Sequence, residues 1–303
     1  MVKWTTSNIP LQHGRLAVVT GTGGLGYEDA LALARAGGEV IIAGRNPGKG
    51  AAAVEKIRQE ARSSTVWFEQ LDLANLASIE RFCERLRSQT GRLHLLINNA
   101  GVMTPPRRLE TDDGFEMQLG ANYLGHFALT ARLMPLLRQA GAARVVTLSS
   151  VAARQGAIDF DDLNAKATYD PMRVYAQSKL ACLMFAFELQ RRSEAGGWGV
   201  FSLAAHPGIA RTNLLHNAPG RWSGAGLARS LLWFLFQPAW QGALPTLFAA
   251  TSFSAKPGAY YGPDGAGEIR GYPAEAKIPH RALDAEASAQ LWAASEALTG
   301  VRF

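Results

Sequence analysis

The chain has little cysteine and no concentrated block of positive charge. Its two cysteines, Cys83 and Cys182, lie in apolar helical patterns within 303 residues. We therefore expect two buried free thiols and a reducing, cytoplasmic location instead of a disulfide framework. The formal net charge is +6, yet no run of Lys and Arg reaches five residues. This scatter argues against a nucleic-acid surface and favours a basic pocket for an anionic small molecule.

The chain also lacks a long apolar segment. Residues 1–14 are polar and contain Pro10, so they do not resemble the apolar centre of a signal peptide. The most apolar later stretch, 231–236, is far shorter than the roughly 20 residues that span a bilayer. We therefore expect no transmembrane segment. No cluster of His, Cys, Asp and Glu indicates a metal site either.

Short β-branched apolar runs alternate with helical patterns along most of the chain. Six such runs predict buried strands, at residues 15–20, 39–43, 65–69, 93–97, 144–148 and 200–205. This alternation predicts right-handed βαβ units. The expected fold class is α/β, a doubly wound Rossmann-type parallel sheet with helices on both faces. We expect a single domain over residues 1–303.

A glycine-rich turn joins the first predicted strand to the first predicted helix. Gly21, Gly23 and Gly26 fit the pattern G-x-G-x-x-G, with Gly24 and Leu25 between the last two. Such a turn lets the backbone approach a pyrophosphate while helix N–H groups face it. Glycine-rich turns are common, but the strand-to-helix context favours a dinucleotide site.

The end of the second predicted strand indicates which dinucleotide binds. A chain that takes NAD(H) places Asp or Glu about 20 residues after the glycines. Here the chain has Arg45 instead. Because an arginine suits the 2′-phosphate, we predict NADP(H) in preference to NAD(H). The alternative is a solvated loop arginine.

Tyr175 and Lys179 lie four residues apart in a predicted helix, and so on one face, one turn apart. An ammonium near a phenol would lower the phenol pKa from about 10. The tyrosine could then exchange a proton with a substrate oxygen near neutral pH. Alone, the pair could be a surface coincidence. Ser149 and Ser150, however, follow the fifth predicted strand, at the sheet edge where ligands bind.

Together these residues resemble the short-chain dehydrogenase/reductase family over roughly residues 14–262. The motifs that carry the resemblance are the glycine turn, Asp72-Leu73, Asn98-Asn99-Ala100-Gly101, Asn122, Ser149-Ser150, Tyr175-x-x-Ser178-Lys179 and Pro207-Gly208. Residues 122–127 and 206–212 look most like the retinol-dehydrogenase-like branch. That resemblance implies an NADP(H)-dependent oxidoreductase that interconverts a lipophilic alcohol and its ketone or aldehyde.

The resemblance also implies roles for the catalytic residues. Tyr175 would be the acid/base, and Lys179 would lower its pKa and hold the nicotinamide ribose. Ser150 would orient the substrate oxygen; it is preferred to Ser149 because the family's serine is usually the later of the pair. Asn122 would support the lysine through a water that relays protons.

For the cofactor, the resemblance implies that Asp72 contacts the adenine, Asn99 the adenosine side and Thr212 the nicotinamide amide. The other implied cofactor residues are Gly21, Gly23, Gly24, Leu25, Gly26, Arg45, Leu73, Ala100, Gly101, Pro207 and Gly208. One departure is the turn itself, because the family usually has three residues between Thr-Gly and Gly-x-Gly and this chain has two. The shorter turn makes Arg45 more important for NADP(H) and could displace the cofactor.

Residues 213–250 are rich in aromatic side chains and follow the sixth strand, where the family usually places a substrate lid. An aromatic lid implies a bulky lipophilic substrate. A core helix or a dimer contact explains the pattern equally well, and shallow membrane association less well. The C-terminal extension, 272–303, is expected to pack on the surface. The family's helices at about 115–137 and 175–190 lead us to expect a homodimer or homotetramer.

Two other functions stay open. A catalytically weak or inactive NADP-binding regulatory or scaffold protein would keep this fold, and the shortened turn favours it. Such proteins tend to lose the tyrosine, lysine or serine, all of which this chain keeps. An epimerase or dehydratase on the same fold is the third possibility.

Overall fold

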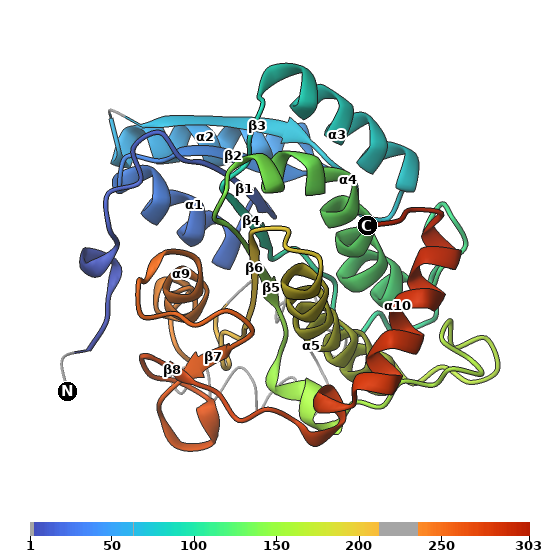
Figure 1. The fold of residues 1–303 in the computed structure, drawn as a ribbon. Helices are drawn as coiled ribbons and strands as arrows, with labels where there is room; N and C mark the ends of the chain where they lie inside the picture. The colour runs from blue at the N-terminus through green and yellow to red at the C-terminus, as the bar shows by residue number, and fades with distance from the viewer. Residues whose placement is uncertain (1–2, 63, 212–235) are drawn as a thin grey trace.

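A single sheet of eight strands runs through the protein in the order β3-β2-β1-β4-β5-β6-β7-β8 (Figure 1). The computed structural model describes residues 3–62, 64–211 and 236–303. The strands are β1 Leu16–Thr20, β2 Glu39–Gly44, β3 Thr65–Gln70, β4 Leu95–Asn98, β5 Ala143–Leu148, β6 Val200–Ala205, β7 Tyr260–Pro263 and β8 Pro273–Glu275. Neighbours are parallel throughout, except that β8 pairs antiparallel with β7. The predicted doubly wound α/β fold is confirmed, and β7 and β8 extend it beyond the six predicted strands.

Helices cover both faces of the sheet (Figure 1). On one face lie α3 Leu76–Gln89, α4 Gly125–Gln139, α5 Pro171–Ala195 and α10 Ala285–Thr299; on the other lie α1 Leu25–Arg35, α2 Pro47–Glu60, α8 Ala239–Gly242 and α9 Leu244–Thr251. Strand β1 shows why both faces are needed. Leu16 and Val18 join the core under α3, α4 and α5, whereas Ala17 and Val19 join the core under α1, α2 and α9. Alternate side chains of a strand point to opposite faces, so the apolar run is buried on both sides.

Polar caps start three of the helices at the edge where the strands end. Asn46, directly after β2, accepts a hydrogen bond from Lys49 N, and Pro47 occupies the first turn of α2. Asn75 accepts from Ser78 N at 2.7 Å and begins α3. Asp170 begins α5 in the same way. Each cap satisfies a free N–H group at a helix start. These helix starts lie at one edge of the sheet because each helix follows a strand that ends there.

The helix that leads into α4 contains a π-helical segment, Leu119–Leu124, within which Asn122 lies. The sequence pattern predicted one continuous helix there. All six residues of the segment are buried. π-Helical turns are rare and concentrate at functional sites.

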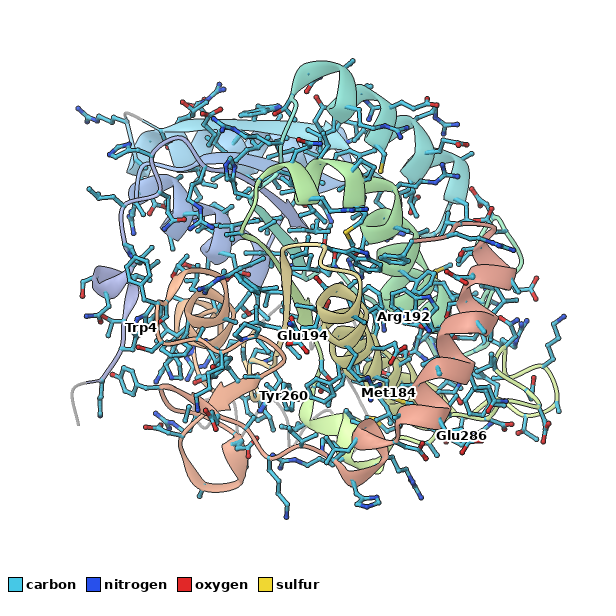
Figure 2. The ribbon with its side chains drawn as sticks, in the orientation of Figure 1. Trp4, Met184, Arg192, Glu194, Tyr260 and Glu286 are labelled. Carbon is cyan, nitrogen blue, oxygen red and sulfur yellow. The ribbon has the colours of Figure 1, made fainter. Side chains whose placement is uncertain are left out.

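The C-terminal helix α10 packs against α5 instead of lying loosely on the surface. The Trp292 ring is buried and contacts the rings of Phe127 and Phe303, with centroids 5.1 and 4.4 Å away. Arg192 extends from α5 (Figure 2). Its guanidinium lies 4.4 Å from the centre of the Trp292 ring. The extension therefore packs on the body of the protein through aromatic side chains that reach the core, while the other face of α10 is exposed. The extension also covers part of the α4 and α5 faces that the family resemblance assigned to dimer contacts.

Residues 213–235 of the predicted substrate lid lie outside the described residues. The rest of that range, 236–250, includes α8 and most of α9, and Leu247 of α9 is fully buried in the core beside α1, whereas Trp240 of α8 is 49% exposed. Helix α9 is therefore a core helix, the alternative to a lid. Cys83 and Cys182 are free and buried, as predicted. Across the described ranges, no helix combines the length and apolarity needed to cross a bilayer.

Candidate active site

The carboxyl ends of β1 to β6 bring the predicted site residues to one edge of the sheet. Strands β1 and β4 are neighbours in the sheet although β2 and β3 separate them along the chain. The sheet order reverses between these two strands, which is where open α/β sheets bind ligands. The glycine turn follows β1, and Asn98-Asn99-Ala100-Gly101 ends β4. Two motifs far apart in sequence therefore meet at the switch point.

The shortened glycine turn closes tightly on itself. Gly21 has φ of +101° and Gly24 has φ of +54°, so both need the freedom of glycine. A Cβ placed on Gly26 would lie 2.5 Å from the Gly21 carbonyl oxygen. Gly23, in contrast, has no other atom within 4 Å of a Cβ position. The turn thus packs on one side and stays open at Gly23, which fits the approach of a pyrophosphate to the backbone.

Asn99 fastens this turn to the end of β4. Its side-chain amide donates to the Thr20 carbonyl oxygen at 2.7 Å. The backbone N–H groups of Asn99 and Ala100 both donate to the Thr20 hydroxyl at 2.9 Å. The predicted cofactor residues Asn99 and Ala100 are thus held against the glycine turn, and the Asn99 amide is used within the protein.

Arg45 follows Gly44, which lies beside the glycine turn. It is exposed and directly follows β2. A Cβ placed on Gly44 would lie 2.7 Å from Cγ2 of Thr22, so the turn touches the end of this strand. Asp72 lies after the neighbouring strand β3, where one carboxylate oxygen accepts from Ala74 N at 2.9 Å. The predicted residues of the adenosine side therefore occupy adjacent strand ends.

Leu73 and Gly101 mark close approaches between elements. A Cβ placed on Gly125 would collide with the Leu73 carbonyl oxygen. A Cβ placed on Gly101 would lie 2.9 Å from Oδ1 of Asn122 and 3.7 Å from Nζ of Lys179. The loop after β4 thus passes between the π-helical segment and α5, and brings Asn122 and Lys179 to one place.

Tyr175 and Lys179 lie on α5 and are both buried. Lys179 Nζ donates to the Leu148 carbonyl oxygen at 3.1 Å, at the end of β5. This bond uses one of three ammonium donors. Lys179 is therefore fixed at the carboxyl edge with donors to spare.

The two serines after β5 have different surroundings. Ser149 is buried, and its hydroxyl donates to the Lys179 carbonyl oxygen at 2.8 Å. Ser150 is half-buried, and its hydroxyl oxygen accepts from Ala152 N at 3.2 Å. No acceptor within the described ranges takes the Ser150 proton. The geometry gives Ser149 a structural bond and favours Ser150 as the serine that meets a substrate.

Asn122 links three elements through its side chain. Its Oδ1 accepts from Val102 N at 2.7 Å, and its Nδ2 donates to Val102 O and to the Ser178 hydroxyl, both at 3.0 Å. Ser178 lies between Tyr175 and Lys179 in sequence. Asn122 thus holds the loop after β4 against the helix that carries the predicted acid/base.

Pro207 and Gly208 are held by residues that the sequence reasoning missed. Gly208 has φ of +61°, and a Cβ there would collide with the Ile269 carbonyl oxygen. The buried Gln237 donates to Pro207 O and accepts from Gly271 N at 3.1 Å. No local pattern at Gln237 or at residues 264–271 signals this role, because it exists only after the chain folds back. Thr212, predicted to contact the nicotinamide amide, lies outside the described residues.

His206 connects Gly208 to a charged network. Its Nδ1 accepts from Gly208 N at 3.2 Å, and its Nε2 lies 2.9 Å from Oε2 of Glu268. The same carboxylate pairs with Arg154 at 2.6 Å, four residues after Ser150. Burial lowers the pKa of His206 to about 4. Tyr260 stacks at a tilt on His206, with ring centroids 5.1 Å apart (Figure 2), and burial raises the Tyr260 pKa.

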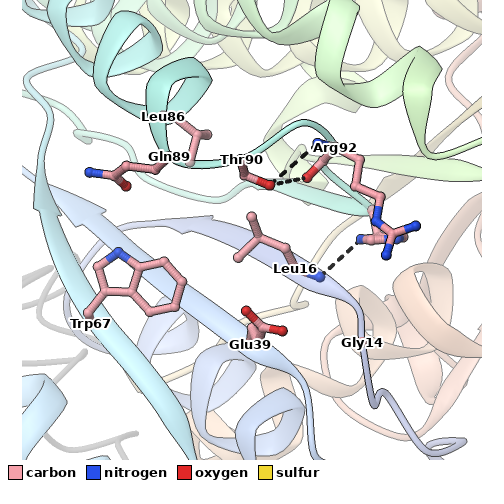
Figure 3. A pocket seen from close by; sticks show the side chains of 9 residues that line it. Gly14, Leu16, Glu39, Trp67, Leu86, Gln89, Thr90 and Arg92 are labelled. Atoms are coloured by element: carbon pink, nitrogen blue, oxygen red, sulfur yellow. Dashed lines mark hydrogen bonds between the residues drawn. The ribbon is translucent and has the colours of Figure 1, made fainter.

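Tyr175 lines neither of two cavities in the structure. One of about 270 Å³ lies at the amino ends of the strands, on the opposite edge of the sheet, and includes Leu16, Glu39 and His94 (Figure 3). Another of about 530 Å³ is lined by charged residues around Arg154 and Glu268. Within the described ranges, no group of three or more His, Cys, Asp or Glu could hold a metal ion. At the carboxyl edge, the open glycine turn and the buried Tyr175 and Lys179 suit a nucleotide cofactor with acid/base side chains.

Comparisons with known proteins agree with this arrangement. Residues 15–221 match the family model described as short chain dehydrogenase. The chain is 41% identical to mouse polyprenol dehydrogenase over 299 residues, covering 96% of this chain and 86% of that protein. It is 40% identical to mouse retinol dehydrogenase 13 over 297 residues, covering 95% and 84%.

Among solved structures, an uncharacterised protein from Mycobacterium paratuberculosis is 39% identical, with a TM-score of 0.82. The match covers 100% of this chain and 99% of that one. Both the predicted family and the resemblance to its retinol-dehydrogenase-like branch are confirmed. The protein belongs to the short-chain dehydrogenase/reductase family of oxidoreductases.

Proposed function

We propose that the protein is an NADP(H)-dependent oxidoreductase that interconverts a lipophilic alcohol and its ketone or aldehyde. The observation that carries this proposal is the meeting of Lys179, Asn122 and Gly101 beside the buried Tyr175. These groups lie at the same sheet edge as an open glycine turn. A proton donor next to a dinucleotide turn is what carbonyl reduction requires.

In this proposal the chain's own residues move and hold the proton. When bound, the nicotinamide cofactor supplies hydride transfer. Tyr175 would give its phenol proton to the substrate oxygen in reduction and take a hydroxyl proton in oxidation. The Ser150 hydroxyl would donate to the same oxygen and orient it. Lys179 keeps two donors for the cofactor ribose and for water, because Leu148 O takes only one.

The exposed Arg45 beside Thr22 supports NADP(H), because it places a guanidinium where a carboxylate would favour NAD(H). The relatives named polyprenol dehydrogenase and retinol dehydrogenase support a lipophilic alcohol as substrate. The buried free cysteines support a cytoplasmic location. A homodimer through α4 and α5 would have to include α10, which covers part of that face.

Tyr175→Phe tests the reaction. The variant should bind NADPH with unchanged affinity, measured by cofactor fluorescence, and lose at least about 1,000-fold in turnover of hydrophobic aldehydes and ketones, because the proton donor is gone. Wild type that binds NADPH without turning over any of these substrates, and is unaffected by Tyr175→Phe, would instead support the inactive binding protein. The feature that favours this alternative is the glycine turn, which is one residue shorter than the family's usual turn.

Arg45→Ala tests the cofactor preference. We expect NADPH affinity to fall about tenfold or more, and NADH affinity to stay unchanged, because only NADPH carries the 2′-phosphate. Arg138→Ala, an exposed change at the end of α4, is the matched control and should alter neither affinity. Equal losses for both dinucleotides would contradict the preference for NADP(H).

A further inference from the structure

His126 is buried between two parts of the candidate site that are far apart in sequence. Its Nε2 lies 2.9 Å from the Thr20 hydroxyl oxygen, just before the glycine turn. Its Nδ1 lies 2.8 Å from the carbonyl oxygen of Asn122, in the π-helical segment. One imidazole ring therefore spans the distance between the cofactor turn and the predicted catalytic asparagine.

The partners of this ring determine where its proton lies. A carbonyl oxygen can only accept, so Nδ1 carries the hydrogen that bonds to Asn122 O. The neutral ring then accepts at Nε2, and Thr20 donates its hydroxyl proton there. Both acceptor positions of the Thr20 hydroxyl are taken by the N–H groups of Asn99 and Ala100. Among the residues that the structure describes, the other acceptor near that proton is Ile97 O, which is farther away at 3.3 Å. Burial and nearby Lys179 lower the His126 pKa to about 4, which keeps the ring neutral at pH 7.

We propose that His126 is a positioning residue that ties the glycine turn to Asn122 through this one tautomer, a role that rests on the proposed function. On the side of the glycine turn, it orients the Thr20 hydroxyl, which accepts hydrogen bonds from the backbone N–H groups of Asn99 and Ala100. Toward the π-helical segment, it holds the backbone of Asn122, whose side chain fastens Val102 and Ser178. The bond to Thr20 thus positions the backbone that would bind the cofactor. The bond to Asn122 positions the helix that carries Tyr175 and Lys179.

Two substitutions test the two hydrogen bonds of the His126 ring separately. His126→Asn keeps a donor near the position of Nδ1 but cannot reach Thr20, whereas His126→Gln can place an acceptor near the position of Nε2 without the bond to Asn122. We expect His126→Asn to raise the dissociation constant for NADPH about tenfold, with kcat within about twofold of wild type. We expect His126→Gln to lower kcat about tenfold with the NADPH dissociation constant within about twofold. A lost hydrogen bond at a positioned group accounts for changes of this size.

Two threonines supply the controls. Thr20→Val removes the bond to His126 together with the two that the hydroxyl accepts from Asn99 N and Ala100 N, so it should weaken NADPH binding at least as much as His126→Asn. The double variant should bind no more weakly than Thr20→Val alone. Thr20→Ser should restore binding. Thr251→Val, which removes a buried hydroxyl that donates to Leu247 O within α9, should lower stability while leaving both kinetic quantities near wild type.

Nitrogen NMR of the cofactor-free protein tests the tautomer without any turnover. At pH 7 the His126 ring should be neutral with its hydrogen on Nδ1. A ring protonated on Nε2 would overturn the proposal, as would His126→Asn and His126→Gln losing affinity and kcat in the same proportion. A wild-type protein that shows the Nδ1 hydrogen but binds neither NADPH nor NADH would overturn the proposed function and, with it, the positioning role. The NMR result and direct binding thus separate a failure of the proposed function from a failure of the tautomer.

Discussion

Two buried histidines bind the backbone on opposite sides of the candidate site, and they are different tautomers. His126 carries its hydrogen on Nδ1 because the Asn122 carbonyl must accept it. His206 accepts from Gly208 N at Nδ1, so its hydrogen lies on Nε2 and is donated to Glu268. Burial lowers the pKa of each to about 4. The same residue type therefore fixes two different backbones, and its neighbours choose the tautomer.

The two regions differ most in charge. Around His126 the hydrogen-bond partners are a hydroxyl and a carbonyl, and the nearby charge is the ammonium of Lys179. Around His206, Glu268 and Arg154 form an ion pair that is partly open to solvent. The first region relies on neutral hydrogen bonds in the interior, and the second on charges near the surface. Perturbations that change charge should therefore separate them.

The largest expected effect comes from acid. A histidine ordinarily titrates near 6.5, so in the unfolded chain each ring takes up its proton first as the pH falls. The free energy of unfolding is then fully retained above about pH 6.5 and lost as the pH falls toward 4, by up to about 3 kcal/mol for each histidine. Urea unfolding at pH 7 and pH 4.5 measures this loss.

Replacing each histidine in turn by Asn sharpens the comparison. His126→Asn and His206→Asn should each remove a similar share of the pH-dependent loss. A much smaller share for His206 would mean that Glu268 stabilises its protonated ring. A loss that neither substitution reduces would contradict the neutral state of both rings.

A smaller effect is expected from removing the charge beside His206. Glu268→Leu leaves Arg154 and the His206 Nε2–H without their shared acceptor. We expect the free energy of unfolding to fall by about 2 kcal/mol, because breaking a partly buried pair leaves polar groups unpaired. Glu268→Gln keeps an acceptor and should cost about half as much. Equal losses for the two variants in urea unfolding would show that the negative charge of the carboxylate, and not its capacity to accept a hydrogen bond, stabilises this network.

The smallest effect should come from moving one hydrogen bond at His206. His206→Gln can keep a donor toward Glu268 but loses the bond to Gly208 N, whereas His206→Asn keeps an acceptor for Gly208. We expect His206→Gln to weaken NADPH binding by about threefold to tenfold, with His206→Asn closer to wild type. Titration of cofactor fluorescence measures both. Equal binding by the two variants would mean that the bond from Gly208 N to His206 does not contribute, and the reverse order would mean that the bond to Glu268 matters more.

Much of the fold was predictable because it is encoded locally. The β-branched runs before Gly21 and after Ala143, the cap at Asn75, and the pair Tyr175 and Lys179 each rest on residues close together in sequence. The strands β7 and β8 were missed because they are only four and three residues long, and because β7 pairs with β6, which lies far away along the chain. The buried position of Trp292 was missed for a related reason, since the rings that surround it come from α4, α5 and the C-terminus.

By itself, the sequence determined the order of strands and helices, the glycine turn, and the residue types available for proton transfer. These depend on periodicity, capping and backbone freedom, which act over a few residues. Tertiary structure alone decided which serine is engaged with Lys179, where the π-helical segment begins, and which nitrogen of each histidine carries hydrogen. Thr20 and His126 are 106 positions apart, and His206 and Glu268 are 62 apart. A proton is placed by the partner that faces it, and only the folded chain brings these partners together.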